Sequence, residues 1–462
     1  MMRTSVKIGA LVLTLTVANM AVAAPPKKPG KADFWPQWRG PNGTGVALRS
    51  NPPTEWSEEK NIRWKAPMTG RSHATPIVWG DRVFVLTAVE TDQTPAEAGA
   101  YVQPGDGEGR RGDRGRRRGG FGMRNAKPTK AYQFQVTALD RKTGKTVWNT
   151  TVHEEVPHEA GHPDASQASA SPLTDGEHVY AFFGSYGLYC LDMKGKVKWE
   201  KDFGDMKTRN EFGEGSSPAL YGDTIVVNWD HEGDDFIVAL NKKTGKELWR
   251  RDRDEPTNWS TPVIFRANGK PQVVVSATNA IQAYDLKTGK DIWSCRGMTA
   301  NTVPTPMIGN GLLYCISGFR GAALLAIRYG AAKGDITDSG TVAWKYDKDT
   351  PYVPSALLYK DVLYFLENNR PILTCLDAKK GEPLAEKRRV EGPDMIYASL
   401  VGAGNKVYIA GRNGKTTVIK HGGEFEVLAT NVLDDGFEAS PAIAGDELFL
   451  RGRKNLYCIA ED

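Results

Sequence analysis

Three groups of residues in this sequence could take part in chemistry. The first lies between residues 152 and 168 and consists of His153, His158, His162, Glu154, Glu155, Glu159 and Asp164. Histidines and carboxylates are common metal ligands, but their spacing here matches neither a helix face nor a strand face. A metal site in this stretch stays open as an alternative, and we expect no metal.

The second group is a set of aspartates in the recurring pattern Leu-Asp-x-Lys-Thr-Gly-Lys-x-x-Trp. The aspartates are Asp140, Asp192, Asp285 and, in a degenerate copy, Asp377. An aspartate at this place can accept hydrogen bonds from the backbone of a tight turn, and glycine adopts the left-handed conformation that the turn requires. We therefore assign these aspartates to structure. The tryptophans that end the pattern are predicted to fill space between neighbouring units.

The third group precedes a second recurring feature, a Ser or Thr that is usually followed by Pro. This feature occurs at Thr75, Ser171, Ser217, Thr261, Thr305, Ser355, Ser399 and Ser440. Small residues stand before several of these positions, whereas aromatic, ionisable or amide side chains stand before others. The candidates for ligand binding are His73, Asn258, Trp259, Tyr352, Tyr397 and Glu438.

Both patterns belong to one repeating unit, which predicts the architecture. A unit of about 45 residues with four short alternating segments is typical of a propeller blade. The eight units therefore predict an all-β, eight-bladed β-propeller of four-stranded antiparallel blades. The C-terminal unit lacks the Lys-x-x-Trp strand, and residues 61–65 supply an orphan strand of that type. We expect this N-terminal strand to complete the C-terminal blade and close the ring, which removes free sheet edges.

Alternating strand direction decides where the candidate residues lie. The loop before the innermost strand and the loop between the second and third strands must share one face of the ring. The six candidates are therefore predicted at the rim of the central channel on that face. There they either form a ligand pocket or only fill the channel.

The flanking segments and insertions lie outside the repeats. Residues 1–24 have the order of a secretory signal peptide, and residues 25–60 form an extension before a single domain at 61–462. No apolar run is long enough to cross a bilayer, and no lipid-bearing cysteine follows the leader. We expect an exported protein, periplasmic or secreted, without a transmembrane segment. Residues 331–340 lengthen the fifth unit, and we assign them no role.

A longer insertion, residues 90–130, interrupts the first unit. Residues 104–130 hold nine Lys/Arg and three Asp/Glu, so the net charge of +5 is concentrated in this stretch. Its Arg/Gly-rich composition predicts a disordered loop. The loop is either a passive insertion or a contact for an anionic cell-surface polymer, and we expect no nucleic acid as a partner.

The five cysteines are Cys190, Cys295, Cys315, Cys375 and Cys458. An odd and low count does not suggest a disulfide framework. We expect them to be small buried hydrophobic residues, with a bridge between Cys295 and Cys315 left open.

The repeat, with its preceding Ser-Pro, resembles the pyrroloquinoline-quinone (PQQ) repeat of eight-bladed propellers over nearly the whole chain after the leader. Within that family the chain is similar to the exported branch around the assembly factor BamB. Residues 35–41, Trp-Pro-Gln-Trp-Arg-Gly-Pro, also resemble the mature start of exported PQQ-like propellers. The motif is specific for the fold and weak for function, because many members do not bind the cofactor.

The resemblance implies two functional alternatives. In quinoprotein alcohol dehydrogenases, PQQ lies over a Trp, calcium is held by Glu and Asn, an Asp acts as the base, and two adjacent cysteines commonly form a disulfide. This chain has no adjacent cysteine pair, no Glu, Asn and Asp set that matches, and only Trp259 with Asn258 as a platform by analogy. We therefore predict a non-catalytic binding or protein-interaction scaffold without a cofactor. Its partner would be an unknown protein or a cell-envelope polymer, and the chain would be monomeric. A PQQ- and calcium-dependent dehydrogenase of alcohols or sugars is the alternative.

Overall fold

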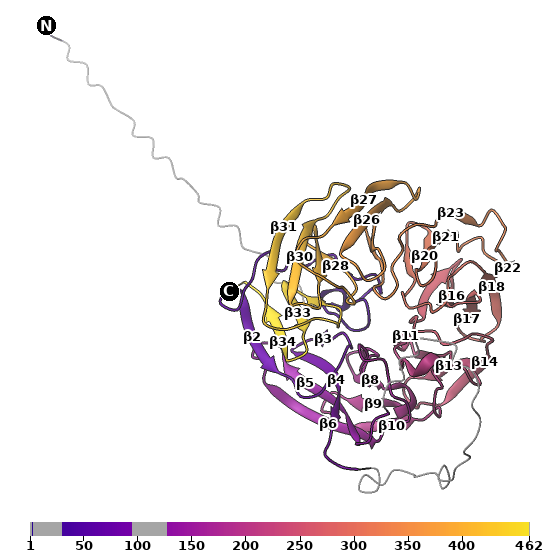
Figure 1. Cartoon of the computed structure of the whole chain (residues 1–462), viewed down its shortest axis with the longest axis horizontal. Helices are drawn as coiled ribbons and strands as arrows, with labels where there is room; N and C mark the ends of the chain where they lie inside the picture. Colours follow the sequence, from indigo (N-terminus) through magenta and orange to yellow (C-terminus); the bar gives the residue numbers. More distant parts are fainter. Residues whose placement is uncertain (1, 3–29, 95–126, 462) are drawn as a thin grey trace, which may run out of the picture.

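The structure is a computed structural model that describes residue 2 and residues 30–94 and 127–461. Eight sheets stand around a central axis in chain order (Figure 1). This arrangement confirms the predicted all-β, eight-bladed propeller with four-stranded antiparallel blades. The predicted leader lies almost wholly outside the described residues, as does most of the predicted insertion, which begins where β4 ends at Glu90.

In blades 1 to 4, the strands follow one another in sequence order from the innermost, beside the central axis, to the outermost, at the rim. Blade 1 contains β3 (Ile77–Trp79), β4 (Arg82–Glu90), β5 (Tyr132–Asp140) and β6 (Thr146–Glu155). Blade 2 contains β7 (Leu173–Thr174), β8 (His178–Phe182), β9 (Leu188–Asp192) and β10 (Val197–Lys201). Blade 3 contains β11 (Ala219–Tyr221), β12 (Thr224–Trp229), β13 (Phe236–Asn241) and β14 (Glu247–Asp252). Blade 4 contains β15 (Val263–Ala267), β16 (Lys270–Ser276), β17 (Ile281–Asp285) and β18 (Asp291–Cys295).

Blades 5 to 8 complete the ring. Blade 5 contains β19 (Met307–Gly309), β20 (Leu312–Ser317), β21 (Ala323–Ile327) and β23 (Val342–Tyr346). Blade 6 contains β24 (Leu357–Tyr359), β25 (Val362–Leu366), β26 (Ile372–Asp377) and β27 (Pro383–Arg389). Blade 7 contains β28 (Val401–Ala403), β29 (Lys406–Ala410), β30 (Lys415–Lys420) and β31 (Val427–Val432). Blade 8 contains β32 (Ala442–Ala444), β33 (Glu447–Arg451), β34 (Asn455–Ile459) and β2 (Ile62–Pro67).

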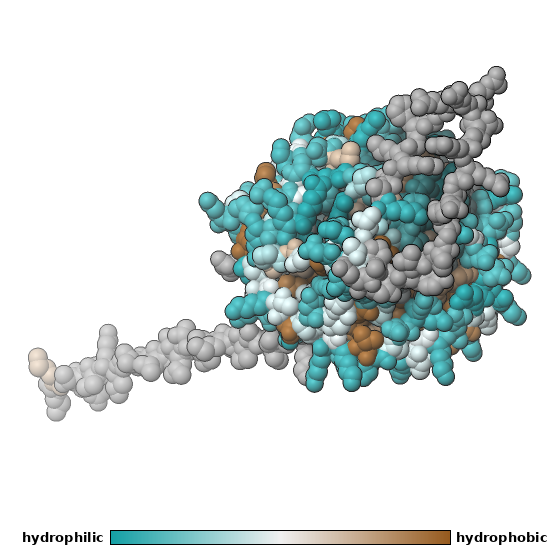
Figure 2. Space-filling view, turned by 60° about the horizontal axis from the view of Figure 1, so that its bottom comes forward, coloured by the Kyte–Doolittle hydropathy of each residue, from teal (hydrophilic) through white to brown (hydrophobic). Residues whose placement is uncertain are grey.

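The core lies between the blades. Middle strands such as β12, β20 and β25 are buried almost throughout, because each sheet packs between two neighbours. Outer strands alternate exposed and partly buried residues, as in β10. Figure 2 shows a largely hydrophilic surface with scattered hydrophobic side chains. No helix among residues 30–94 and 127–461 is long and apolar enough to cross a membrane.

The predicted ring closure is confirmed. Strand β2 pairs antiparallel with β34, with Trp64 opposite Cys458 and Ala66 opposite Leu456. The closing strand covers residues 62–67, slightly later than the predicted 61–65. The C-terminal blade is thus complete only when the N-terminal strand joins it.

Tryptophans join the blades near the rim, and we call these contacts the outer belt. In each contact, the indole of an outer strand lies on the turn glycine of the next blade: Trp64 on Gly144, Trp148 on Gly195, Trp199 on Gly245, Trp249 on Gly289 and Trp344 on Gly381. A Cβ atom on Gly245 would lie 2.7 Å from the Trp199 ring, so the turn glycine is also required for packing. The indole N–H of Trp199 donates to the carbonyl oxygen of Lys242 at 3.0 Å. The turn aspartates cap their turns as predicted, with Thr143 N 2.8 Å from Asp140 Oδ1.

The outer belt changes between blades 4 and 5, where the inserted residues 331–340 replace the usual turn. Strand β22 (Gly334–Asp335) pairs parallel with β18 and adds a fifth strand to blade 4. Ala332 and Ile336 pack in the same cluster as Trp293. This insertion, which was predicted to have no role, therefore covers Trp293, a tryptophan that has no turn glycine to lie on.

Residues 35–47 pass across one end of the central channel, between blade 1 and blade 7. Trp35 pairs with Val78 of blade 1, and β1 (Val46–Ala47) pairs parallel with β28 of blade 7. The buried Arg39 guanidinium donates to the carbonyl oxygens of Leu400 at 2.6 Å and Ala356 at 2.7 Å. Burial lowers the pKa of Arg39 to about 9. The Trp-Pro-Gln-Trp-Arg-Gly-Pro segment is thus a cross-brace between blades.

All five cysteines are buried and free. Cys295 and Cys315 share a core cluster between blades 4 and 5 without forming a bridge. This agrees with the expectation that the cysteines act as small hydrophobic residues.

Candidate functional site

Five of the six candidate residues line one cavity of about 400 Å³ at the channel mouth. They are His73, Trp259, Tyr352, Tyr397 and Glu438. Each comes from the loop that enters the innermost strand of a blade, which is the position in the repeat from which their place at the rim was predicted; ligand binding by them stays a prediction. We call this space the mouth cavity.

Asn258 is the exception. Its amide Nδ2 donates to Asp230 Oδ2 and to the Ser276 carbonyl oxygen, both at 3.0 Å, and its Oδ1 accepts from the Ser260 backbone N–H at 3.0 Å. The side chain lines a smaller adjoining cavity of about 20 Å³. Its polar atoms are therefore engaged in holding the loop that carries Trp259.

One wall of the mouth cavity is charged. Glu438 Oε1 accepts hydrogen bonds from Arg412 Nε at 3.1 Å and from Arg453 Nε at 2.9 Å. Asp164 accepts from Arg412 at 2.7 Å and from the Tyr397 hydroxyl at 3.0 Å. Burial alone would raise the pKa of both carboxyls, but these donors hold each pKa below its usual range. Both groups are therefore held as carboxylates.

His73 belongs to the same wall. Burial lowers its pKa to about 4, although the nearby Glu438 carboxylate acts in the opposite direction. Because the desolvation of the imidazolium dominates, His73 is neutral at pH 7. Its backbone N–H is tied to Ser166 Oγ at 3.1 Å, in the loop that also carries Asp164.

The other wall is aromatic. The Trp259 indole N–H donates to the Gly213 carbonyl oxygen at 2.7 Å, which fixes the ring plane. Tyr352 stacks on Phe319 with ring centroids 4.8 Å apart, and burial raises the pKa of Tyr352. Phe212 completes this wall. Trp259, Phe319 and Tyr352 come from blades 4, 5 and 6, so the aromatic faces belong to three consecutive blades of the eight.

The inner end of the mouth cavity is lined by hydroxyls. The recurring Ser/Thr residues connect neighbouring blades, because the backbone N–H of six of the eight donates to the hydroxyl of the next; we call these residues the inner belt. The links are Thr75 to Ser171, Ser171 to Ser217, Ser217 to Thr261, Thr305 to Ser355, Ser355 to Ser399 and Ser399 to Ser440, at 2.8–3.0 Å. Within the part of the chain that the structure describes, the six acceptor hydroxyls donate no hydrogen bond of their own. Their protons are available to a ligand.

Trp38 interrupts the inner belt. Its indole N–H donates to Thr305 Oγ1 at 2.9 Å, and its ring lines both the mouth cavity and a second cavity of about 70 Å³ beyond it. The N-terminal cross-brace thus supplies part of the floor.

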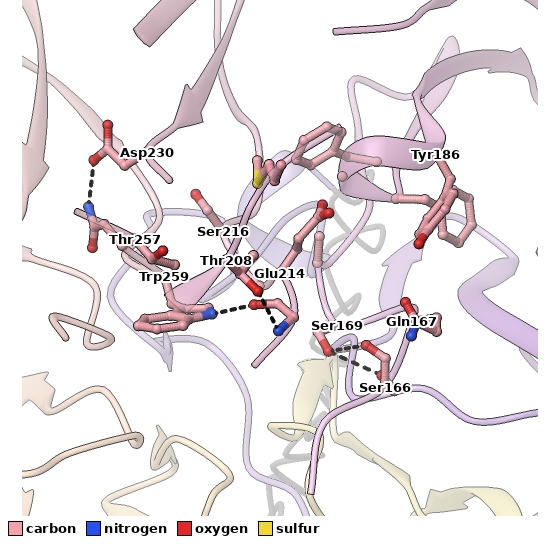
Figure 3. A pocket seen from close by; sticks show the side chains of 18 residues that line it. Ser166, Gln167, Ser169, Tyr186, Thr208, Glu214, Ser216, Asp230, Thr257 and Trp259 are labelled. Carbon is pink, nitrogen blue, oxygen red and sulfur yellow. Dashed lines mark hydrogen bonds between the residues drawn. The ribbon is translucent and has the colours of Figure 1, made fainter. Parts of the chain in front are cut away.

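The small adjoining cavity contains a partly buried carboxyl, Glu214, near Trp259 (Figure 3). The backbone N–H and the hydroxyl of Ser185 donate to its two oxygens, at 2.8 and 2.5 Å. Burial raises the pKa of Glu214 to about 7 despite these donors. The group is therefore partly protonated near neutral pH.

The histidine-rich loop does not gather its ligand types around one point. His153 contacts Glu155 at 2.9 Å, His158 lies against the Met206 carbonyl oxygen at 2.8 Å, and His162 packs edge-on to Phe212. Among the described residues, the group close enough to share an ion is Asp175, Glu177 and His178, and its Asp175 is paired with Lys242. The loop instead brings Asp164 and His162 to the mouth cavity.

Sequence reasoning missed Asp164, Arg412, Arg453, Trp38 and the hydroxyls as parts of the site. For two of these residues, the position in the repeat could have predicted a place in the site. Arg412 and Arg453 both lie between the second and third strands of their blades, which must share a face with the candidates. Trp38 has no such position, since no repeat relates it to the channel.

Comparison with known proteins places the chain in a family. The family model described as outer membrane protein assembly factor BamB matches residues 129–234 and 233–462. The chain belongs to this family. The BamB of Yersinia pestis is 24% identical over 340 residues, which cover 69% of this chain and 77% of that protein. The matched residues of the BamB model begin after the N-terminal cross-brace.

Solved structures share the fold. A quinohemoprotein alcohol dehydrogenase from Pseudomonas putida HK5 has a TM-score of 0.54 at 10% identity, covering 92% of this chain and 80% of that one. The computationally designed Ika8 protein has a TM-score of 0.50 at 13% identity, covering 72% of this chain and 94% of that one. At these identities the likeness concerns the fold alone, so it does not choose between a BamB-like scaffold and a dehydrogenase.

Proposed function

We propose that this chain is an exported, non-catalytic scaffold that binds a protein or polymer of the cell envelope at its mouth cavity. The observation that carries the proposal is the pairing of the charged wall. Glu438 is bound by two arginines, and Asp164 by an arginine and a tyrosine hydroxyl. A general base works best with a pKa near the operating pH, whereas both carboxyls have lowered values. Asp164 and Glu438 therefore suit recognition better than proton transfer, whereas Glu214, which also lines the cavity, has its pKa raised by burial to about 7 and is the lining carboxyl that could exchange a proton at neutral pH.

The donor set also fits PQQ poorly. The quinone carries three carboxylates and would need cationic partners. The described residues that line the mouth cavity include Asp164, Glu214 and Glu438 but no lysine or arginine. Arg412 and Arg453 lie behind this lining and are already paired. We therefore propose that the chain works without this cofactor.

Calcium would meet a similar difficulty at the platform proposed by analogy. Asn258 uses both ends of its amide within the protein: Nδ2 donates to Asp230 and to the Ser276 carbonyl oxygen, and Oδ1 accepts from the Ser260 backbone N–H. Asp230 is in turn bound to Arg253 at 2.6 Å, with neither side chain exposed. A cation there would have to displace an existing buried ion pair.

The family supports the binding role. Relatives carry the description outer membrane protein assembly factor, and the leader predicted at residues 1–24 is that of an exported protein. We propose that this chain likewise holds a partner in the cell envelope.

A cofactor titration and site-specific cross-linking test the two halves of this proposal. After dialysis against PQQ and Ca²⁺, we expect no retained quinone absorbance and no dye reduction with alcohols or sugars. Stoichiometric retention with turnover that Trp259→Ala abolishes would establish the dehydrogenase instead.

A photo-reactive amino acid in place of Phe319 should form a discrete adduct with a protein or polymer in intact cells. The control position is Leu248, which is 52% exposed on the outer strand of blade 3. Equal adducts at both positions would contradict a binding role for the mouth cavity.

A further inference from the structure

The mouth cavity combines three kinds of surface that restrict what can bind there. The inner belt supplies hydrogen-bond donors, the charged wall supplies acceptors, and the opposite wall supplies aromatic faces. Each restricts the ligand in a different way, and the three conditions must hold together.

The inner belt requires a ligand that can accept hydrogen bonds. Each acceptor hydroxyl, such as Ser217 or Ser355, already receives one backbone N–H and keeps its own proton. Because the hydroxyls line the cavity, a ligand that cannot accept would leave these donors without partners on displacing water. Ammonium and guanidinium groups have no hydrogen-bond acceptor, so they cannot accept the hydroxyl protons of the inner belt.

The charged wall requires a ligand that can donate and that is not an anion. Asp164 and Glu438 present carboxylates, and their charges are matched by Arg412 and Arg453 behind them. A hydroxyl that donates to such a carboxylate makes a charge-assisted bond without the desolvation of an ionic ligand. An anionic ligand would face the carboxylates directly.

The aromatic wall requires an apolar face. Trp259 is fixed by its bond to Gly213, and Tyr352 is fixed by its stacking on Phe319. Such pre-positioned rings bind flat C–H surfaces at low entropic cost.

A pyranose ring meets all three conditions, since its hydroxyls both donate and accept and its axial C–H groups form an apolar face. Resting on the binding role proposed for this site, we infer that the mouth cavity binds a neutral saccharide, the end of a glycan chain. The cavity of about 400 Å³ falls within the size range of small-molecule sites. The hydroxyls of the floor hold the ring oxygens, the charged wall takes the ring hydroxyls, and the aromatic wall covers one face.

Titration calorimetry on the full chain tests this inference with cellobiose, maltose and N,N′-diacetylchitobiose as neutral probes. The charged probes are the chitosan disaccharide, digalacturonate and hexylamine. We expect at least one neutral disaccharide to bind at least about tenfold more tightly than every charged probe. The inference is wrong if no neutral probe binds, or if a charged probe binds best.

Matched variants locate the site. Tyr352→Ala should weaken saccharide binding by about tenfold or more, because it removes an aromatic face from the cavity. Tyr329→Ala is the control, because Tyr329 also belongs to an aromatic pair with centroids 4.8 Å apart but lies outside the cavity. Equal affinities for both variants would overturn the assignment, with thermal melting to show that each is folded.

The cross-linking experiment separates this inference from the proposed function. A protein adduct at Phe319 without any saccharide binding would refute the inference and leave the scaffold role intact. If neither a discrete adduct at Phe319 nor saccharide binding is found, both the scaffold role and the saccharide inference are wrong.

Discussion

The inner and outer belts join the same neighbouring blades but use their polar groups differently. In the outer belt, each ring lies on a turn glycine, and four of the five indole N–H groups donate to a backbone carbonyl oxygen; that of Trp344 has no partner among the described residues. In the inner belt, Ser217 accepts one N–H and still has a proton to give. A contact that satisfies all its groups only holds the fold, whereas one that leaves groups unsatisfied around a cavity also prepares a binding surface.

Substitution of a turn glycine should break the outer belt and give the largest effect. Gly245 has φ +68°, and a Cβ there would lie 2.7 Å from the Trp199 ring. We expect Gly245→Ala to lower the free energy of unfolding by about 3 kcal/mol, from backbone strain plus overpacking. Gly222 has φ +59° but nothing within 4 Å of a Cβ, so Gly222→Ala should cost only about 1 kcal/mol. Chemical denaturation measures both, and equal losses would show that the tryptophan contact contributes nothing.

Loss of one belt hydroxyl should break the inner belt with a smaller effect. Ser217→Ala leaves the buried N–H of Ser171 without its 2.9 Å acceptor. We expect a loss of about 1–2 kcal/mol in the free energy of unfolding. Ser57→Ala removes a hydroxyl that also accepts a backbone N–H, at 3.2 Å, but in an exposed turn. Denaturation of this control should show almost no change; a comparable loss would mean that burial does not decide the cost.

The pH dependence of stability should give the smallest effect, because two groups beside the mouth cavity oppose each other. The pKa of His73 falls to about 4 on folding, so its contribution to stability is lost as the pH decreases from about 6.5 to 4. The pKa of Glu214 rises to about 7, so its contribution is lost as the pH increases from about 4.5 to 7. The two slopes partly cancel in the wild-type chain.

Substituting either His73 or Glu214 should make the pH dependence of the free energy of unfolding that comes from the other group visible. In His73→Gln, the free energy of unfolding should fall more steeply than in the wild-type chain as the pH rises from about 5 to 7, because His73 no longer opposes Glu214. In Glu214→Gln the slope over the same interval should be more positive than in the wild-type chain, because Glu255, whose pKa burial also raises to about 7, is present in both. Denaturation at a series of pH values checks both signs, and a change of the same sign in the two variants would contradict the assigned burial effects.

The sequence was sufficient for the fold because the repeat is dictated by local chemistry. The turn of Asp140 to Gly144 and the tryptophan that follows recur wherever a blade must turn and then contact its neighbour, so their period reports the blade directly. The ring closure followed from the same period, since one unit lacked a strand and residues 62–67 supplied it.

The candidate site was only partly predictable, because its parts differ in how they depend on the repeat. Residues in phase with the repeat, such as Trp259 and Glu438, were placed correctly at the cavity. Asn258 was misplaced because the direction of a side chain beside a known position depends on its hydrogen bonds, here to Asp230. Asp164 and Trp38 come from a loop and a segment without a period, so only tertiary structure shows where they lie.

Ring closure also imposes an order of events on folding. Strand β2 pairs with β34, so one blade joins residues 62–67 to residues 455–459 across almost the whole domain. The entropic cost of such a long closure grows only slowly with length, but the contact cannot form until the last strand is present. Until then both strands expose an unpaired edge, and the seven other blades can be assembled while the ring is still open. The pairing of β2 with β34 is therefore the step of folding at which another strand could most easily pair with one of these two edges instead.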